Sequence, residues 1–231
     1  MPKTSSGSAI EVHTLRYGGT WWIKLCAPSL GRWCKVHGHK LRVWGKSRKY
    51  PAAKFRVVDM LAEFLAGKSD WFIHMDADIY VDAGAGIPNV RGGMYATVAS
   101  VALGRPTNAG PCKGDRDFRR WFKTHYKKKV RNWKYRNTGV WMCDRTAASQ
   151  LLEVIKEPFI TGYQEQHQLN AWFREAEEAG MTLSELSSTW NDMGIGVGRL
   201  FGQGTNFYHL AGANKSKRLP SLIERFKSEI R

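Results

Sequence analysis

The sequence predicts an α/β fold in which a mixed, mostly parallel β-sheet is flanked by helices. Short apolar strand patterns alternate with longer stretches of helical periodicity along most of the chain. One predicted strand, at residues 71–75, is apolar at consecutive positions, which is typical of a strand covered on both faces. The chain has 231 residues, 42% of them hydrophobic. We therefore expect a flexible tail at residues 1–8 and a single domain over residues 9–231.

The first part of the chain is predicted to contain two short strands and a helix. Residues 9–15 alternate apolar and polar side chains, which indicates a strand. Residues 21–37 carry apolar side chains at helical spacing, and we expect Pro28 and Gly31 to bend or split that helix. Residues 40–44 then form a second short strand.

The clearest helix is predicted over residues 51–66. Pro51 suits the first helical position, and Gly67 suits the end of the helix. One face is apolar and is formed by Phe55, Val58, Leu61, Ala62 and Leu65. The buried strand at residues 71–75, with His74 inside it, follows this helix.

The rest of the chain continues the alternation. We expect strands at residues 94–101, 138–143 and 206–210, and helices at residues 145–156, 163–179 and 219–230. A basic, aromatic segment at residues 115–136 is expected to be partly helical, and a glycine-rich stretch covers residues 194–204.

The composition excludes several classes of protein. Ten Trp, ten Phe and eight Tyr are too many for a disordered chain. No run approaches the roughly 18 apolar residues of a membrane-spanning helix. The first residues lack the apolar core of a signal peptide, so we expect a cytoplasmic protein that could lie peripherally on a membrane. The net charge of +16 favours polyanionic partners: nucleic acid, anionic lipid headgroups or phosphorylated small molecules.

The cysteines give little support to a metal or redox site. The four residues, Cys26, Cys34, Cys112 and Cys143, contain no C-x-x-C pair, so zinc-ribbon and thioredoxin-like sites are not indicated. Because no signal peptide is present, we expect reduced thiols. Cys143 lies within an apolar run and is interpreted as a small core residue.

The most informative feature is the pair of acids that follows the buried strand. Asp76 and Asp78 interrupt an otherwise apolar run, WFIHM-DAD-IYV. Open α/β sheets bind ligands at the carboxyl ends of their strands, and residues i and i+2 of an extended segment share a face. Two adjacent carboxylates are costly there unless a cation compensates them. A polar turn is the alternative, but the pattern favours a site for Mg²⁺ or Mn²⁺ that could bind a diphosphate.

The sequence resembles nucleotide-sugar glycosyltransferases of the Rossmann-like GT-A fold. The likeness is to the galactosyl-, xylosyl- and mannosyltransferases of plant xyloglucan and fungal mannan synthesis. Residues 54–81 resemble that family's helix, strand and Asp-x-Asp segment, and residues 136–140 resemble its Asn-Thr-Gly strand start. Residues 162–166 resemble its acidic-Gln segment, and residues 208–212 with Lys215 resemble its late His-x-x-Gly segment.

This resemblance implies a metal-dependent transferase that moves a hexosyl or pentosyl group from a nucleoside diphosphate sugar to a glycan or lipid-linked acceptor. UDP is the favoured carrier, GDP is the alternative, and the family retains the anomeric configuration. The implied cofactor is Mn²⁺ or Mg²⁺, held by Asp78 and His209, with Asp76 on the metal or on the ribose.

The resemblance also implies a donor site and a catalytic segment. The donor-binding residues would be Thr14, Leu15, Arg16, Tyr17, Lys54, Asp76, Ala77, Asn137, Thr138, Gly139, Gly212 and Lys215. Thr14 to Tyr17 would meet the base and ribose, and Lys54 and Lys215 the phosphates. Glu165 and Gln166 would lie near the anomeric carbon. The chain departs from the family in its shorter length, in its lack of a membrane anchor and stem, and in Glu165 where Asp is usual.

Two other functions stay open. Ten basic residues are interleaved with aromatic ones over residues 116–136, and cationic grooves with aromatic platforms bind single-stranded nucleic acid. No recognised nucleic-acid motif supports that alternative. The segment could instead hold the protein against an acceptor or an anionic membrane surface, or be a solvated helix whose aromatic side chains pack inward. A non-catalytic sugar-nucleotide binding module is the third possibility.

Overall fold

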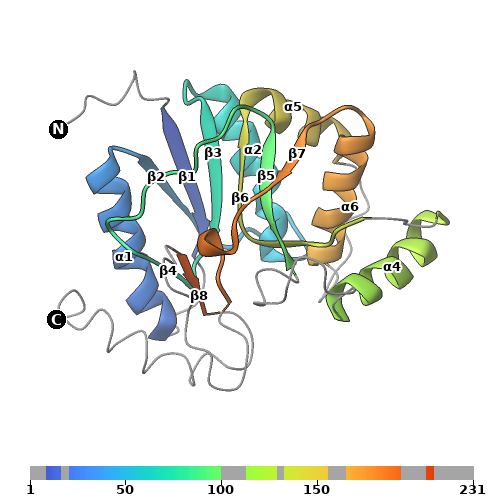
Figure 1. Cartoon of the computed structure of the whole chain (residues 1–231), viewed down its shortest axis with the longest axis horizontal. Coiled ribbons are helices and arrows are strands. Elements are labelled where there is room, and N and C mark those ends of the chain that lie inside the picture. Colours follow the sequence, from blue (N-terminus) through green and yellow to red (C-terminus); the bar gives the residue numbers. More distant parts are fainter. Residues whose placement is uncertain are drawn as a thin grey trace.

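The computed structural model describes residues 9–16, 21–99, 113–128, 133–155, 165–193 and 207–210. These residues form a six-stranded sheet with the strand order β2-β1-β3-β6-β5-β7 (Figure 1). Its strands are β1 (Ile10–Leu15), β2 (Lys40–Trp44), β3 (Trp71–Asp76), β5 (Met94–Val98), β6 (Arg136–Asp144) and β7 (Leu183–Glu185). Only β6 runs against the other five, because it is antiparallel to both β3 and β5. The predicted mixed, mostly parallel sheet is confirmed.

A two-stranded sheet completes the β-structure. It pairs β4 (Ile79–Val81) with β8 (Phe207–His209) in antiparallel register. Figure 1 shows this small sheet below the main one, where β3 ends. It therefore brings a late part of the chain to the carboxyl end of the central strand.

Helices cover both faces of the main sheet. One face packs against α2 (Val57–Ala66), α5 (Arg145–Val154) and α6 (Glu165–Glu178), and α4 (Lys113–Tyr126) joins α6 on that side. The other face packs against α1 (Trp21–His37), the small β-sheet and a 3-10 turn, η3 (Ser188–Trp190). Two large apolar cores result, one on each face of the sheet, and a smaller cluster lies between α1 and the small β-sheet.

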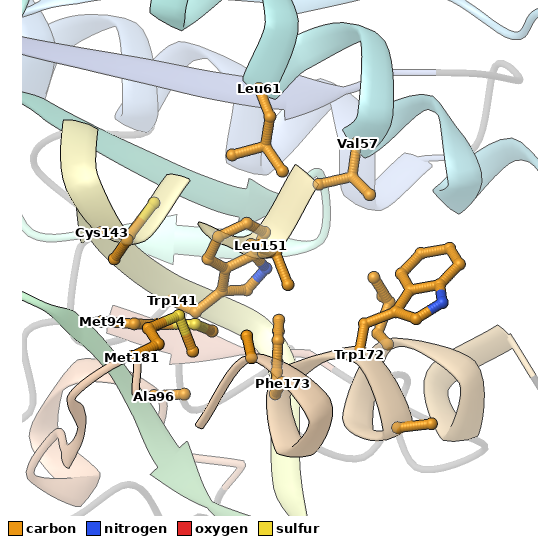
Figure 2. Close-up of a cluster of buried hydrophobic side chains, with 14 of the residues drawn as sticks. Val57, Leu61, Met94, Ala96, Trp141, Cys143, Leu151, Trp172, Phe173 and Met181 are labelled. Atoms are coloured by element: carbon orange, nitrogen blue, oxygen red, sulfur yellow. The ribbon is translucent and has the colours of Figure 1, made fainter. Parts of the chain in front are cut away.

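The central strand contributes to both cores, as its apolar sequence predicts. Phe72 lies in the core beneath α2 and α5, and Ile73 lies in the core beneath α1. Figure 2 shows the first core, in which Trp141 of β6 lies among side chains from the helices and the neighbouring strand. Burial of this kind contributes roughly 1.5–3 kcal/mol for each large apolar side chain.

Several predicted boundaries are corrected by the structure. The helix predicted from Pro51 starts as a 3-10 turn, η1 (Ala53–Arg56), and becomes α-helical only at Val57. The Tyr50 hydroxyl donates to Asp59 Oδ1 over 2.7 Å. This hydrogen bond holds the chain just before the 3-10 turn against α2. The strand predicted to reach residue 101 is assigned as β5 only to Val98, and β4, β7 and η3 were not predicted.

Other local predictions are confirmed or lie outside the described residues. Residues 21–37 form one helix that contains Pro28, so the helix is not split. Cys143 is a buried core residue, and Cys26 and Cys34 are also buried free thiols. The tail at residues 1–8, the glycine-rich stretch and the C-terminal helix predicted at residues 219–230 lie outside the described part of the chain. Among the described helices, none combines the length and the apolarity needed to cross a membrane.

A fully buried acid, Glu11, connects β1 to β2. It accepts hydrogen bonds from Lys40 Nζ over 2.8 Å and from Arg42 Nε over 3.1 Å. The ring of His13 lies between Glu11 and Trp44: the Trp44 Nε1–H donates to His13 Nδ1 over 2.9 Å, and His13 Nε2 is 3.2 Å from Glu11 Oε1. Because Nδ1 accepts, the proton of the neutral ring is on Nε2, the atom that faces Glu11 Oε1.

This arrangement predicts a loss of stability in mild acid. Burial lowers the pKa of His13 from 6.5 to about 4, although Glu11 opposes the shift. In the unfolded chain His13 takes up a proton once the pH falls below 6.5, whereas in the folded chain it does so only near pH 4. The free energy of unfolding therefore decreases as the pH is lowered from 6.5 to about 4. A shift of this size corresponds to about 3 kcal/mol. Urea unfolding of the wild type and of His13→Gln should show a weaker pH dependence in the variant over that interval. Equal pH dependence in both proteins would contradict the prediction.

Candidate metal centre

The site begins where the central strand ends. Asp76 is the last residue of β3, and a two-residue turn of Ala77 and Asp78 leads into β4. The pairing of β4 with β8 sets His209 opposite Ile79, and the Leu210 N–H donates to the Asp78 carbonyl over 3.0 Å. Strand pairing therefore fixes an imidazole beside two carboxylates that are far from it in sequence.

The three side chains converge on one point. Ligand atoms of Asp76, Asp78 and His209 all lie within 4.8 Å of one another. His209 Nε2 is 3.4 Å from Asp78 Oδ1 and 3.9 Å from Asp76 Oδ2. His209 is buried, whereas the two carboxylates are partly open to solvent. The site is thus held by a buried imidazole at its base and is reached from the carboxylate side.

The surroundings keep Asp76 ionised. Lys54 Nζ lies 3.5 Å from Asp76 Oδ2, and His74 Nε2 lies 3.4 Å from Asp76 Oδ1. Burial raises the pKa of Asp76 and the charge on Asp78 adds to that effect, but Lys54 and His74 outweigh both. The pKa of Asp76 therefore lies below its usual value, and the site carries a carboxylate at neutral pH.

These donors fit a divalent cation. An octahedral cation with bonds of about 2.1 Å places neighbouring ligand atoms about 3.0 Å apart and opposite ones about 4.2 Å apart. The separations of 3.4 and 3.9 Å from His209 Nε2 to the carboxylate oxygens are wider than those of neighbouring ligands, so small side-chain movements would bring all three groups onto one cation. Two carboxylate oxygens and one imidazole nitrogen suit Mn²⁺ or Mg²⁺, whereas a Zn²⁺ site would be expected to have more nitrogen or sulfur.

The imidazole of His209 rests against a glycine. A Cβ atom on Gly139 would lie 2.7 Å from His209 Nδ1 and closer still to Cε1. The same His209 Nδ1 is 2.8 Å from Asn191 Oδ1, and Asn191 Nδ2 donates to Asn137 Oδ1 over 2.8 Å. The residues at the start of β6 thus lie against the histidine of the site.

A cavity of about 100 Å³ adjoins Asp76. Of the predicted donor residues, Thr14, Arg16, Asp76 and Ala77 line it, together with apolar side chains of α1, β2 and β4. The Thr14 hydroxyl is buried and has no hydrogen-bond partner among the described residues. Leu15 points to the opposite core, beneath α2, so its side chain does not reach the cavity. Tyr17 is outside the described residues.

The structure describes only some of the remaining predicted site residues. Thr138 is buried, and Glu165 is the first residue of α6. Gln166 is half-buried, and its carbonyl accepts from Asn170 Nδ2 over 3.0 Å. Gly212 and Lys215 lie outside the described part of the chain. Sequence reasoning missed Asn191, because nothing in its local sequence marks it and only the fold brings it to His209.

Helix α4 separates its charges from its aromatic rings. Phe118, Trp121 and Phe122 are buried, and Tyr126 stacks on Phe122 at a ring separation of 4.5 Å. The exposed side carries a row of basic side chains: Lys113, Arg116, Arg120, Lys123 and Lys127. Within residues 113–128 the large rings therefore face the core, and the surface of α4 lacks the aromatic platform that single-stranded nucleic acid would need.

Comparison with known proteins shows the fold. No family model matches the sequence, and no curated protein sequence matches it. Among solved structures, the chain is similar to a glycosyltransferase involved in the glycosylation of the major capsid of PBCV-1, with 12% identity, 93% of this chain and 98% of that chain covered, and a TM-score of 0.57. A second solved structure is a mutant of Drosophila β-1,4-galactosyltransferase 7 in complex with manganese, UDP-Gal and xylobiose. It is 13% identical to this chain, with 91% of this chain and 74% of that chain covered and a TM-score of 0.47. The chain thus shares the GT-A-like fold of the first of these.

Proposed function

We propose that the protein is a metal-dependent glycosyltransferase that uses a nucleoside diphosphate sugar as donor. The observation that carries the proposal is the convergence of Asp76, Asp78 and His209 at the carboxyl end of the central strand. Such an edge is where open α/β sheets bind their ligands. A cation held there would lie directly beside the cavity that Thr14 and Arg16 line.

The arrangement suits cleavage of a bond to a diphosphate. In sugar transfer the bond between the anomeric carbon and the diphosphate oxygen breaks, and negative charge develops on the leaving group. A bound Mn²⁺ or Mg²⁺ supplies Lewis-acid stabilisation of that charge. The two carboxylates and the imidazole hold the cation, and Lys54, 3.5 Å from Asp76, adds a positive charge at the same edge. Lys215 and Gly212 are proposed as further phosphate contacts.

The cavity supports UDP as the favoured carrier. It is small, at about 100 Å³, and its walls include apolar side chains of α1, β2 and β4. A pyrimidine is smaller than a purine and fits such a space more readily. The buried Thr14 hydroxyl offers a hydrogen bond to the base or ribose. GDP is the alternative carrier. Comparing the binding of UDP and of GDP would distinguish the two.

Other roles follow from the resemblance to the retaining family. Glu165 and Gln166, at the start of α6, are proposed to face the anomeric carbon and the acceptor, with retention of configuration. Asn137 and Thr138 are proposed to bind hydroxyl groups of the donor sugar. The transferred sugar is proposed to be a hexose or a pentose, and the acceptor a glycan or a lipid-linked acceptor.

The proposal is tested by a thermal-shift screen of UDP- and GDP-sugars, each with and without Mn²⁺. A ligand that binds only the folded chain raises its melting temperature, so the preferred donor should raise it only when Mn²⁺ is present. Release of the nucleoside diphosphate from the preferred donor, compared with and without mixed glycan acceptors, would then separate a transferase from a non-catalytic binding module. A screen in which no nucleotide-sugar shifts the melting temperature would overturn the proposal.

We also propose that the protein is cytoplasmic and that the basic face of α4 holds it peripherally on an anionic membrane. Figure 1 shows α4 at the opposite end of the molecule from α1. Each exposed basic side chain adds about 1 kcal/mol of attraction to an anionic surface.

Reversing two charges, Arg120→Glu with Lys123→Glu, should weaken binding to phosphatidylserine vesicles by at least about tenfold. The matched control reverses Lys24 and Lys35, which are exposed on α1. Equal loss in both variants would contradict a role specific to α4.

A further inference from the structure

A chain of hydrogen bonds with a fixed direction ends at the candidate metal histidine. It starts at the main-chain N–H of Gly139, which donates to Asn137 Oδ1 over 2.8 Å. A main-chain N–H can only donate, so the side-chain atom of Asn137 that it meets is the carbonyl oxygen. The amide nitrogen of Asn137 points the other way, 3.0 Å from the Met193 sulfur. The orientation of Asn137 is therefore set by the backbone.

The orientation of Asn137 in turn fixes the orientation of the Asn191 side chain. The same Asn137 Oδ1 lies 2.8 Å from the side chain of Asn191, and since an oxygen accepts, Asn191 must present its Nδ2 there. The other end of the amide is then Oδ1, which lies 2.8 Å from His209 Nδ1. Asn191 is completely buried, so water does not compete for either end. The carbonyl oxygen and the nitrogen of its side-chain amide therefore each have one assigned role.

The state of the imidazole follows from this chain. Asn191 Oδ1 can only accept, so His209 Nδ1 carries the hydrogen that it donates. In the neutral ring the lone pair is then on Nε2, the atom that lies 3.4 Å from Asp78 and 3.9 Å from Asp76. A lone pair beside two carboxylates is an unfavourable arrangement by itself and a favourable one around a cation.

We infer that Asn191 is a positioning residue that holds His209 in the Nδ1–H tautomer, so that Nε2 is presented to a metal ion between the two carboxylates. The inference deepens the proposed function, because it rests on the metal site that this function requires. It also gives the Asn-Thr-Gly segment a role besides donor binding: Asn137 orients Asn191, and Gly139 leaves room for the imidazole.

The tautomer can be measured directly in the metal-free protein. Long-range ¹⁵N–¹H spectra of ¹⁵N-histidine-labelled wild type, at mildly alkaline pH, should show His209 with a protonated Nδ1 and an unprotonated Nε2. The measurement needs neither a donor sugar nor activity, so it remains decisive if the glycosyltransferase proposal fails. An Nε2–H tautomer in the wild type would overturn the inference.

Two substitutions separate positioning from packing. Asn191→Leu keeps the volume but removes the acceptor, so Mn²⁺ affinity measured by EPR titration should fall about 10- to 100-fold. Asn191→Asp keeps an acceptor for Nδ1 but sets a second acceptor against Asn137 Oδ1, so it should lower the melting temperature and still preserve the tautomer and Mn²⁺ affinity within a few-fold. Wild-type Mn²⁺ affinity in Asn191→Leu would overturn the inference, as would Mn²⁺ affinities that simply follow the stabilities of the two variants.

Discussion

Replacing Asp78 with asparagine is expected to abolish Mn²⁺-dependent binding of the nucleotide-sugar while leaving the fold intact. Asparagine has nearly the same shape but lacks the charge that a divalent cation requires. Loss of a direct ligand should weaken Mn²⁺ binding by about 100-fold or more, because loss of an outer-shell partner already costs about 10- to 100-fold. Asp78→Ala should have the same effect. Both are measured by EPR titration with Mn²⁺ and by thermal shift with donor.

The same substitution should not destabilise the metal-free protein. The charge on Asp78 raises the pKa of Asp76, which means that the two carboxylates repel each other when no cation lies between them. Removing one charge relieves that repulsion, so the melting temperature without metal should stay the same or rise. Asp82→Asn is the matched control: Asp82 Oδ1 accepts from the Gly84 N–H, which asparagine also allows, and Asp82 is outside the three-residue cluster. Unchanged Mn²⁺ affinity in Asp78→Asn would remove Asp78 from the metal site.

A methyl group at position 139 is expected to disrupt both the stability and the site. In Gly139→Ala the new Cβ would lie 2.7 Å from His209 Nδ1 and 3.0 Å from Asn137 Oδ1, and both partners are buried. Overpacking of this kind costs about 1–3 kcal/mol, and the imidazole must shift from its position beside the carboxylates to relieve it. We expect a lower melting temperature together with a loss of Mn²⁺ affinity.

Gly45→Ala provides the control for this prediction. Gly45 has nothing within 4 Å of an added Cβ, so alanine there should leave stability and Mn²⁺ affinity close to wild type. Urea unfolding and EPR titration of the two variants give the comparison. If Gly139→Ala matched Gly45→Ala in both measurements, the imidazole of His209 would not rest on Gly139 as the structure describes.

Local patterns in the sequence predicted most of the elements. The run of apolar residues at 71–75 predicted a strand buried on both faces, and β3 is third in a six-stranded sheet with a core on each side. The helix at Pro51 was placed too early, because the turn there depends on the contact between Tyr50 and Asp59. The short strand β7 carries too few residues for a periodic pattern and is identified only through its pairing with β5.

The residues of the candidate site also divide into those that the sequence indicates and those that only the fold brings together. Asp76 and Asp78 are separated by a single residue, so the chain itself indicates a carboxylate pair at a strand end. His209 was implied only by a resemblance, and Asn191 was not indicated at all. Both reach the site through long-range contacts: β8 pairs with β4, and Asn191 lies between Asn137 and His209. The basic helix α4 is a similar case, since only its packing shows that its large rings face inward.

The sequence by itself determined most of the longer strands and helices and the place of the acidic pair, because these depend on the periodicity and chemistry of neighbouring residues. The tertiary structure alone decided the reversal of β6, the convergence of His209 on the carboxylates and the direction of the hydrogen bonds that end at His209. These features depend on which distant segments pair and in what register, and that is settled by the joint packing of the whole chain rather than by any single segment.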